Sequence, residues 1–158
     1  MPSIHLTTFI AAPIERVFDL SRSIDLHKQS MTRYKEEPVA GTRFGLIGKD
    51  ETVTWKAKHF FKTRFLRSRI TELDRPVLFT DIQEEGDFSS MKHEHHFKPV
   101  ENGTLLIDLF EFETPYGAIG KTLNSIWLTG YMRRLLEERN QLIRTYAESD
   151  QWKKILQK

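Results

Sequence analysis

The feature that most constrains the fold of this chain is a change of hydrophobic period near residue 115. Before it, five runs alternate between apolar and polar residues and are rich in β-branched and aromatic side chains, which predicts strands. These runs are Glu51–Phe60, Thr63–Leu73, Val77–Glu84, Phe88–Pro99 and Thr104–Thr114. Short turn-forming separators such as Asn102-Gly103 connect them, so neighbouring strands are expected to be antiparallel. Beyond Gly117, apolar residues from Ile119 to Tyr146 recur at helical spacing and predict one helix of up to about 30 residues.

The first third of the chain predicts one strand and two short helices. Ile4–Ile10 has the composition of a strand, and Pro13–Leu20 places its apolar residues on one face of about two helical turns. Ser21–Ser30 is expected to form a second short helix, followed by an edge strand and turns between residues 31 and 48. A long amphipathic helix needs a broad apolar surface to pack against, and only the concave face of the strands is large enough. The predicted class is therefore α+β, with a curved antiparallel sheet wrapped around a long C-terminal helix.

Composition narrows the classes of protein to consider. The chain has 158 residues, 39% of them hydrophobic, which suits a single domain over residues 1–158 with its own core. With 24 Lys and Arg against 22 Asp and Glu, the charge is too balanced to indicate a nucleic-acid partner, and we expect none. The absence of cysteine excludes disulfides, thiolate nucleophiles and Cys-based zinc sites, and it fits a reducing compartment. Because no signal-peptide pattern or long apolar run is present, we expect a cytoplasmic protein.

The order of elements and several short segments resemble the SRPBCC, or helix-grip, superfamily. The segments are Phe9–Phe18, Trp55–Phe60, Phe79–Gln83, His93–Phe97 and Gly103–Asp108. The superfamily includes START-like, Bet v 1-like and polyketide cyclase/dehydrase-like proteins, and these segments look like a bacterial branch labelled "cell-division-inhibitor-like". The resemblance implies the helix-grip fold, with two short helices after the first strand and a ligand cavity between the sheet and the last helix. It implies no particular reaction.

Strand alternation brings several polar side chains onto the predicted concave face. Asp108 lies on an otherwise apolar stripe, where a charge is costly unless it is paired. His93 and His95 share one face of their strand, and Asp81 is on the inward face of the preceding strand. A histidine beside an aspartate has its tautomer fixed and its basicity raised, which suits proton abstraction next to a carbonyl group. The candidate catalytic residues are therefore His93, His95, Asp81 and Asp108.

An interior that combines aromatic side chains with a few polar groups is typical of a small-molecule site. The candidate ligand-binding residues are Trp55, His59, Phe79, Gln83, Met91, Phe97, Leu106, Phe110, Phe112, Leu123, Trp127 and Tyr131. Three interpretations of the polar groups stay open: mutual pairing that only shapes the interior, recognition of a polar group on an apolar ligand, and catalysis. His93 and His95 with a carboxylate resemble part of a metal site, but the pattern supplies no definite third ligand, so we predict no metal and no cofactor.

Three functions follow from these features. The first is binding of an apolar or aromatic small molecule, lipid or polyketide-like, in the cavity. The second is a cyclase- or dehydratase-type enzyme that uses the His and Asp residues. The third is a surface-interaction module built on a basic hairpin, whose cations are Lys56, Lys58, Lys62, Arg64, Arg67 and Arg69. Phe60 and Phe61 at its tip would then make peripheral membrane contact, unless the charges only keep an exposed sheet face in solution. No oligomeric state is favoured.

Two features of the long helix carry further expectations. Gly130 is costly in a helix interior and indicates close approach of a strand or ligand, or a bend over the cavity. The charged residues between Arg133 and Arg139 are expected to form an exposed face with ion pairs four residues apart.

Overall fold

The computed structural model describes residues 2–114 and 118–157, without the side chains of residues 118–125. Its strands are β1 (Ser3–Ile10), β2 (Glu37–Gly41), β3 (Thr52–His59), β4 (Lys62–Asp74), β5 (Leu78–Glu85), β6 (Ser90–Val100) and β7 (Gly103–Glu113). Its helices are α1 (Ile14–Ser21), α2 (Ile24–Ser30), the 3-10 helix η1 (Thr32–Tyr34), α3 (Ala118–Ala147) and α4 (Trp152–Leu156). The order of elements is the predicted one, and η1 and α4 are additions that the sequence pattern did not indicate.

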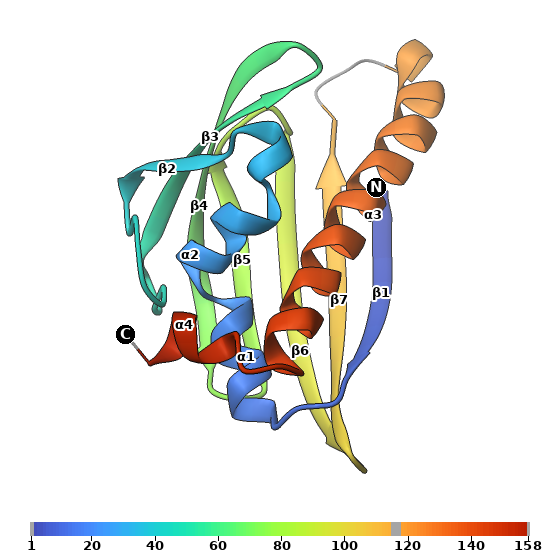
Figure 1. Ribbon diagram of the computed structural model, residues 1–158. Coiled ribbons are helices and arrows are strands. Elements are labelled where there is room, and N and C mark those ends of the chain that lie inside the picture. The colour runs from blue at the N-terminus through green and yellow to red at the C-terminus, as the bar shows by residue number, and fades with distance from the viewer. Residues whose placement is uncertain (1, 115–117, 158) are drawn as a thin grey trace.

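The strands form one seven-stranded antiparallel sheet in the order β1-β7-β6-β5-β4-β3-β2. From β2 to β7 each strand pairs with the next one along the chain, and β1 closes the far edge beside β7. Figure 1 shows the sheet as a curved surface, with α3 on the same side as α1 and α2. The predicted class, a curved antiparallel sheet wrapped around a long C-terminal helix, is confirmed.

Local signals position the two short helices over the concave face. Pro13 precedes α1 with an extended backbone, and Ser23 caps α2 by accepting a hydrogen bond from the backbone N–H of Leu26 at 3.1 Å. α1 packs against α3, α4, β6 and β7, while α2 packs against α3 and β2. The short helices and α3 therefore form a second layer that covers one face of the sheet.

The turn between β6 and β7 fixes the register on which the site depends. Asn102 adopts a φ of 67°, a conformation that asparagine tolerates in tight hairpins. A Cβ atom on Gly103 would lie 2.4 Å from the carbonyl oxygen of Ile10, so a larger residue would displace β1. With this turn in place, His95 lies opposite Asp108.

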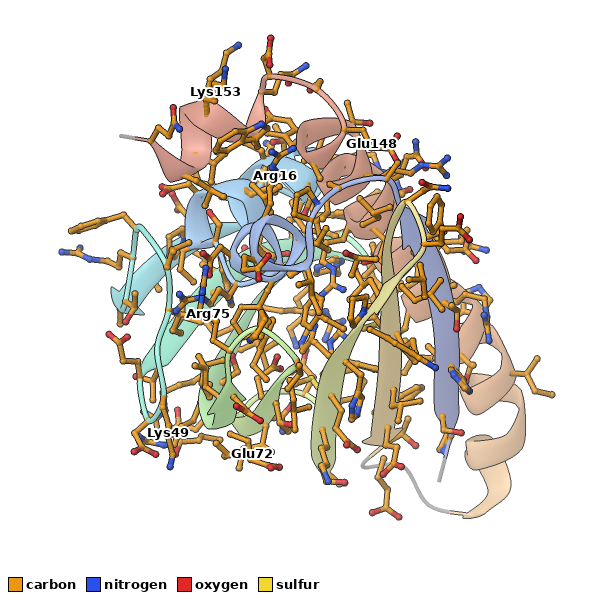
Figure 2. All side chains as sticks on the ribbon, turned by 90° about the horizontal axis from the view of Figure 1, so that it is seen from below. Arg16, Lys49, Glu72, Arg75, Glu148 and Lys153 are labelled. Carbon is orange, nitrogen blue, oxygen red and sulfur yellow. The ribbon has the colours of Figure 1, made fainter. Side chains whose placement is uncertain are left out.

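Two groups of buried apolar side chains form the core, and polar residues lie between them along β6 and β7. One group includes Phe18, Phe97 and Leu106, and the other includes Met91 and Phe110. The residues between these groups on the two strands are His93, His95 and Asp108. Charged side chains are more often found on the exterior, as with Lys49, Glu72 and Lys153 in Figure 2. In the interior of this protein, these polar residues separate the two apolar groups of the core.

Candidate functional site

A cavity of about 400 Å³ lies between the concave face of the sheet and the helical layer. This volume falls within the range of small-molecule sites in proteins. Eight of the predicted ligand-binding residues line it: Trp55, His59, Phe79, Gln83, Met91, Phe110, Trp127 and Tyr131. Ile24 from α2 and Leu135 and Leu136 from α3 complete its apolar wall.

Three other predicted ligand-binding residues are buried but do not line the cavity. Phe97 and Leu106 belong to the core group that contains Phe18, because α1 covers this end of β6 and β7. Phe112 packs against the rings of Phe88 and Phe110. The structure therefore assigns these three residues to core packing. The side chain of Leu123 lies outside the described residues.

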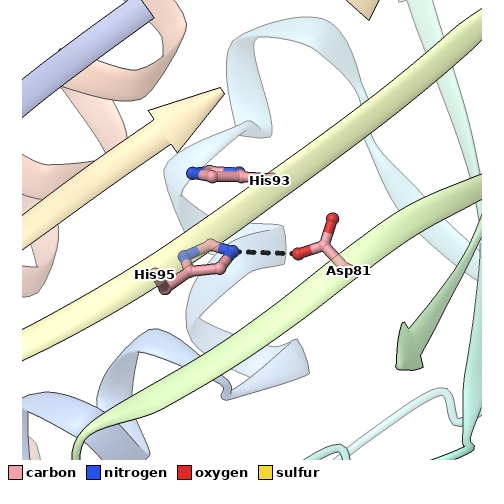
Figure 3. A group of neighbouring side chains, drawn as sticks. All are labelled: Asp81, His93 and His95. Carbon is pink, nitrogen blue, oxygen red and sulfur yellow. Dashed lines mark hydrogen bonds and ion pairs between the residues drawn. The ribbon is translucent and has the colours of Figure 1, made fainter. Parts of the chain in front are cut away.

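A buried polar cluster interrupts the apolar interior where β5, β6, β7 and α3 meet. Its members are Asp81, His93, His95, Asp108, Arg139 and Asn140. The register places Asp81 opposite His93 and Asp108 opposite His95, but the hydrogen bonds run diagonally. Nε2 of His93 lies 2.7 Å from Asp108 Oδ1. Nε2 of His95 lies 2.9 Å from Asp81 Oδ2, the pair joined by the dashed line in Figure 3. The four predicted catalytic residues thus form two His–Asp pairs.

Helix α3 closes the cluster with Arg139 and Asn140. Nη2 of Arg139 donates to Asp108 Oδ1 at 2.7 Å, and its Nη1 lies 3.4 Å from His95 Nδ1. Nδ2 of Asn140 donates to Asp108 Oδ2 at 2.7 Å. Arg139 is only 6% exposed, so the expectation that it belongs to an exposed helix face is wrong. Asp108 therefore has partners on both carboxylate oxygens and does not line the cavity.

Burial and neighbouring charges set the protonation states in the cluster. Burial, reinforced by His93, lowers the pKa of His95 to about 3, so its imidazole is neutral at physiological pH. Burial opposes ionisation of Asp108, but Arg139 and His93 outweigh it and hold the pKa of this carboxyl well below its usual range. Burial also opposes ionisation of Asp81, and the hydrogen bond from His95 with the nearby charges lowers its pKa all the same. Two carboxylates thus face one guanidinium, so negative charge exceeds positive charge among Asp81, Asp108 and Arg139.

Three side chains of the cluster also have the spacing of metal ligands. One ligand atom from each of Asp81, His93 and His95 lies within 4.8 Å of the others, so Asp81 supplies the third donor that the sequence pattern left undefined. A metal ion there would replace the hydrogen bond between His95 and Asp81 and lie near the guanidinium of Arg139. The same side chains already form hydrogen bonds within the cluster, so the arrangement favours a hydrogen-bonded network.

An aromatic rim lies where the β3–β4 hairpin meets the first half of α3. Its members are Phe60, Phe61, Trp127 and Tyr131. Phe60, Trp127 and Tyr131 line the cavity and pack on one another, and Phe61 follows Phe60 in the hairpin turn. The hydroxyl of Tyr131 lies 2.6 Å from Nδ1 of His59. Burial, with Tyr34 nearby, raises the pKa of Tyr131 to about 12, so its hydroxyl keeps its proton. The rim is exposed at Phe60 and Trp127, and Phe61 is 99% exposed.

The basic hairpin next to this rim is less cationic than its sequence suggests. Arg64 pairs with Asp87, and Arg69 pairs with Glu84, each at 2.7 Å. Arg67 pairs with Glu84 and Glu85. Of the cations of this hairpin, only Lys56, Lys58 and Lys62 have no ion pair among the described residues. No helix of the described chain combines the length and the apolar character that a membrane span requires.

Comparison with known proteins identifies the fold. No protein-family model matches the sequence, and no curated protein matches it. A protein of Thermus thermophilus superimposes with a TM-score of 0.75 at 20% identity, over 92% of this chain and 97% of that one. Ara h 8.0201 superimposes with a TM-score of 0.67 at 12% identity, over 92% of this chain and 96% of that one. The chain has the Bet v 1-like helix-grip fold.

The ginseng major latex-like protein 151 of Panax ginseng also shares the helix-grip fold. Its TM-score is 0.66 at 15% identity, over 93% of this chain and 97% of that one. At these identities the likeness establishes the fold alone. The site must therefore be interpreted from the residues of this chain.

Arg139 and Asn140 are the members of the buried polar cluster that the sequence interpretation missed. A usable signal was present, because Arg139 lies four residues after Leu135 and four before Ile143, both on the buried stripe of α3. A Cβ atom built on Gly130 meets no atom within 4 Å, so no strand among the described residues approaches it closely. The alternatives of a bound ligand or a bend in the helix stay open.

Proposed function

We propose that the protein binds an apolar or aromatic small molecule in the cavity between the sheet and α3, with residues 1–158 acting as one ligand-binding domain. The observation that carries this proposal is a cavity of about 400 Å³ whose wall is largely apolar and includes Asp81, His93 and His95 of the buried polar cluster. Trp55, Phe79 and Phe110 present rings to this space, which suits an aromatic, lipid or polyketide-like ligand. An unfilled apolar cavity destabilises a protein, and a ligand that occupies it adds to stability.

A filling substitution tests this proposal. Ala57 is buried on β3 and lines the cavity, so Ala57→Phe should occupy the space that a ligand needs. We expect the wild-type chain to bind the apolar dye N-phenyl-1-naphthylamine saturably at one site, and Ala57→Phe to lose this binding. Ala40→Phe, the same change at an exposed position of β2, is the matched control and should bind normally. Unchanged dye binding by Ala57→Phe would contradict the proposal.

Binding is favoured over a cyclase or dehydratase reaction because His95, one of the two predicted bases, is a poor base. A general base works best with a pKa near the working pH, whereas that of His95 is lowered to about 3. Nε2 of His95 also faces Asp81, and its Nδ1 faces Arg139. Turnover of a bound compound that His93→Gln or His95→Gln abolished without loss of binding would reverse this preference.

Membrane contact by the aromatic rim is a second candidate function. Phe60 and Phe61 adopt φ values of 55° and 62° at the two-residue turn, where asparagine and glycine are preferred. Both backbone conformations are strained for phenylalanine. The ring of Phe61 is 99% exposed, so packing within the chain does not offset the strain at this residue. Lys58 and Lys62 flank them and suit an anionic surface.

A further inference from the structure

We propose that the ligand carries a hydrogen-bond donor, a hydroxyl or an amine, which Asp81 accepts at the cavity wall. This inference rests on the proposed binding function and specifies the chemistry of its ligand.

Asp81 has an acceptor to spare. Its Oδ2 accepts the hydrogen bond from His95 at 2.9 Å. Its Oδ1 points away from His95 in Figure 3 and receives no hydrogen bond from the described residues. Asp81 lines the cavity, so this oxygen is within reach of a bound molecule.

The hydrogen-bond donors of His95 and Arg139 already have partners within the buried polar cluster. The carboxylate of Asp81 places the proton of neutral His95 on Nε2, and Nη1 of Arg139 faces its Nδ1. Nε2 of His93 lies 2.7 Å from Asp108 Oδ1, and no hydrogen bond joins its Nδ1 to the described residues. Each nitrogen of Arg139 already contacts a partner inside the cluster. A ligand that brings a donor thus meets unsatisfied partners.

Charge around the cavity disfavours an anionic ligand. Arg139 is shared between the two carboxylates of the cluster, of which Asp108 takes the direct bond. The other arginines that line the cavity, Arg22 and Arg64, pair with Asp19 and Asp87. No lysine is among the described lining residues. A carboxylate ligand would therefore meet the excess negative charge without an unpaired cation nearby.

Three naphthalene compounds that differ in one substituent test this inference. The probes are 2-naphthol, which carries a donor, 2-methoxynaphthalene, which has only an acceptor, and 2-naphthoate, which is an anion. Calorimetric titration at about pH 8 keeps free imidazoles neutral. We expect 2-naphthol to bind at least about tenfold more tightly than the ether, the range for a hydrogen bond to a charged group, and 2-naphthoate to bind most weakly.

Asp81→Asn should reverse this preference. The amide oxygen can keep the hydrogen bond from His95, which turns the amide N–H₂ towards the cavity and replaces an acceptor with a donor. The variant should therefore lose affinity for 2-naphthol and gain affinity for the ether and the anion. A gain cannot come from unfolding. Glu94→Gln removes a carboxylate from the adjacent strand on the outer face and should keep the wild-type order.

Equal affinity for 2-naphthol and its ether, unchanged in Asp81→Asn, would overturn this inference and leave the binding function standing. Tighter binding of 2-naphthoate by the wild-type chain would overturn it as well. If none of the three compounds binds, the inference and the proposed function both fail. Titration with zinc alone completes the test, because stoichiometric uptake lost in Asp81→Asn would show that a metal ion occupies these acceptors instead.

Discussion

The buried polar cluster and the aromatic rim differ in burial and in the interactions that hold their side chains. In the buried polar cluster every side chain is hydrogen-bonded to another, and Asp108 is 0% exposed. At the aromatic rim the rings stack on one another but remain open to solvent, and Phe61 is 99% exposed. Buried networks hold a single geometry because each broken bond leaves an unsatisfied group, whereas an exposed aromatic patch can rearrange. The buried polar cluster is therefore the rigid part of the cavity wall, and the aromatic rim is the part that can rearrange.

The largest expected effect on stability concerns the buried polar cluster. Asp108→Asn removes the carboxylate that Arg139 contacts at 2.7 Å and leaves a buried guanidinium without its direct partner. Breaking a buried pair in this way costs about 3–5 kcal/mol. We expect a loss of that size in the free energy of unfolding, measured by urea denaturation with tryptophan fluorescence.

The matched control for this loss is Glu111→Gln, which removes an exposed carboxylate from the same strand and should cost little. The double variant Asp108→Asn with Arg139→Met should regain part of the stability, because the unpaired charge is gone. A loss below about 1 kcal/mol in Asp108→Asn would mean that the cluster is not the rigid element described above.

A fall in pH should also lower the stability that the buried polar cluster contributes. Folding lowers the pKa of His95 from 6.5 to about 3, so between these values the unfolded chain binds a proton that the native chain does not. Stability should therefore fall by about 1.4 kcal/mol per pH unit from this residue as pH drops below 6.5. Asp81 and Asp108 have lowered pKa values, so their contribution is present above the unfolded value of 3.8 and is lost below it.

His95→Gln isolates the histidine contribution. Unfolding curves recorded between about pH 7 and pH 4.5 should have a slope against pH that is smaller by about one proton in the variant. Parallel curves would show that His95 takes up its proton in the folded state after all.

The smallest expected effect on stability lies at the rim, and its sign is opposite. Phe61→Gly relieves a residue at a φ of 62°, so we expect a gain of about 0.5–1 kcal/mol after the extra flexibility of glycine is counted. The same change should reduce sedimentation with vesicles of equimolar phosphatidylcholine and phosphatidylglycerol. Phe44→Gly removes another exposed ring, away from the rim, and should leave vesicle binding unchanged. Equal sedimentation of wild type and Phe61→Gly would rule out membrane contact through this turn.

Alternation and turn residues were sufficient to predict the strands and the inward orientation of His93, His95 and Asp108, because period-two patterns are strong where one face is buried. These patterns could not distinguish residues that line the cavity from residues that pack in the core. Phe97 and Leu106 point inward like Phe110, but α1 covers them, and strand alternation says nothing about which helix packs above a residue.

In the helices too, features that depend on tertiary contacts could not be predicted from the sequence pattern. Charged helix residues are usually exposed, which predicts a surface position for Arg139, although its spacing on α3 matches the buried stripe. A buried charge becomes predictable only once its partners are known, and Asp108 lies 31 residues away in sequence. α4 has five residues, too few for a helical period to emerge.

Native mass spectrometry of the purified chain tests the central claim most directly. The binding account predicts one small molecule per chain, lost on denaturation, carried by the wild type and by Ala40→Phe but absent from Ala57→Phe. A wild-type chain that stays bare, both as purified and after incubation with an apolar cell extract, would contradict it. An adduct of equal occupancy in Ala57→Phe would contradict it too, because the ligand would then lie outside the cavity.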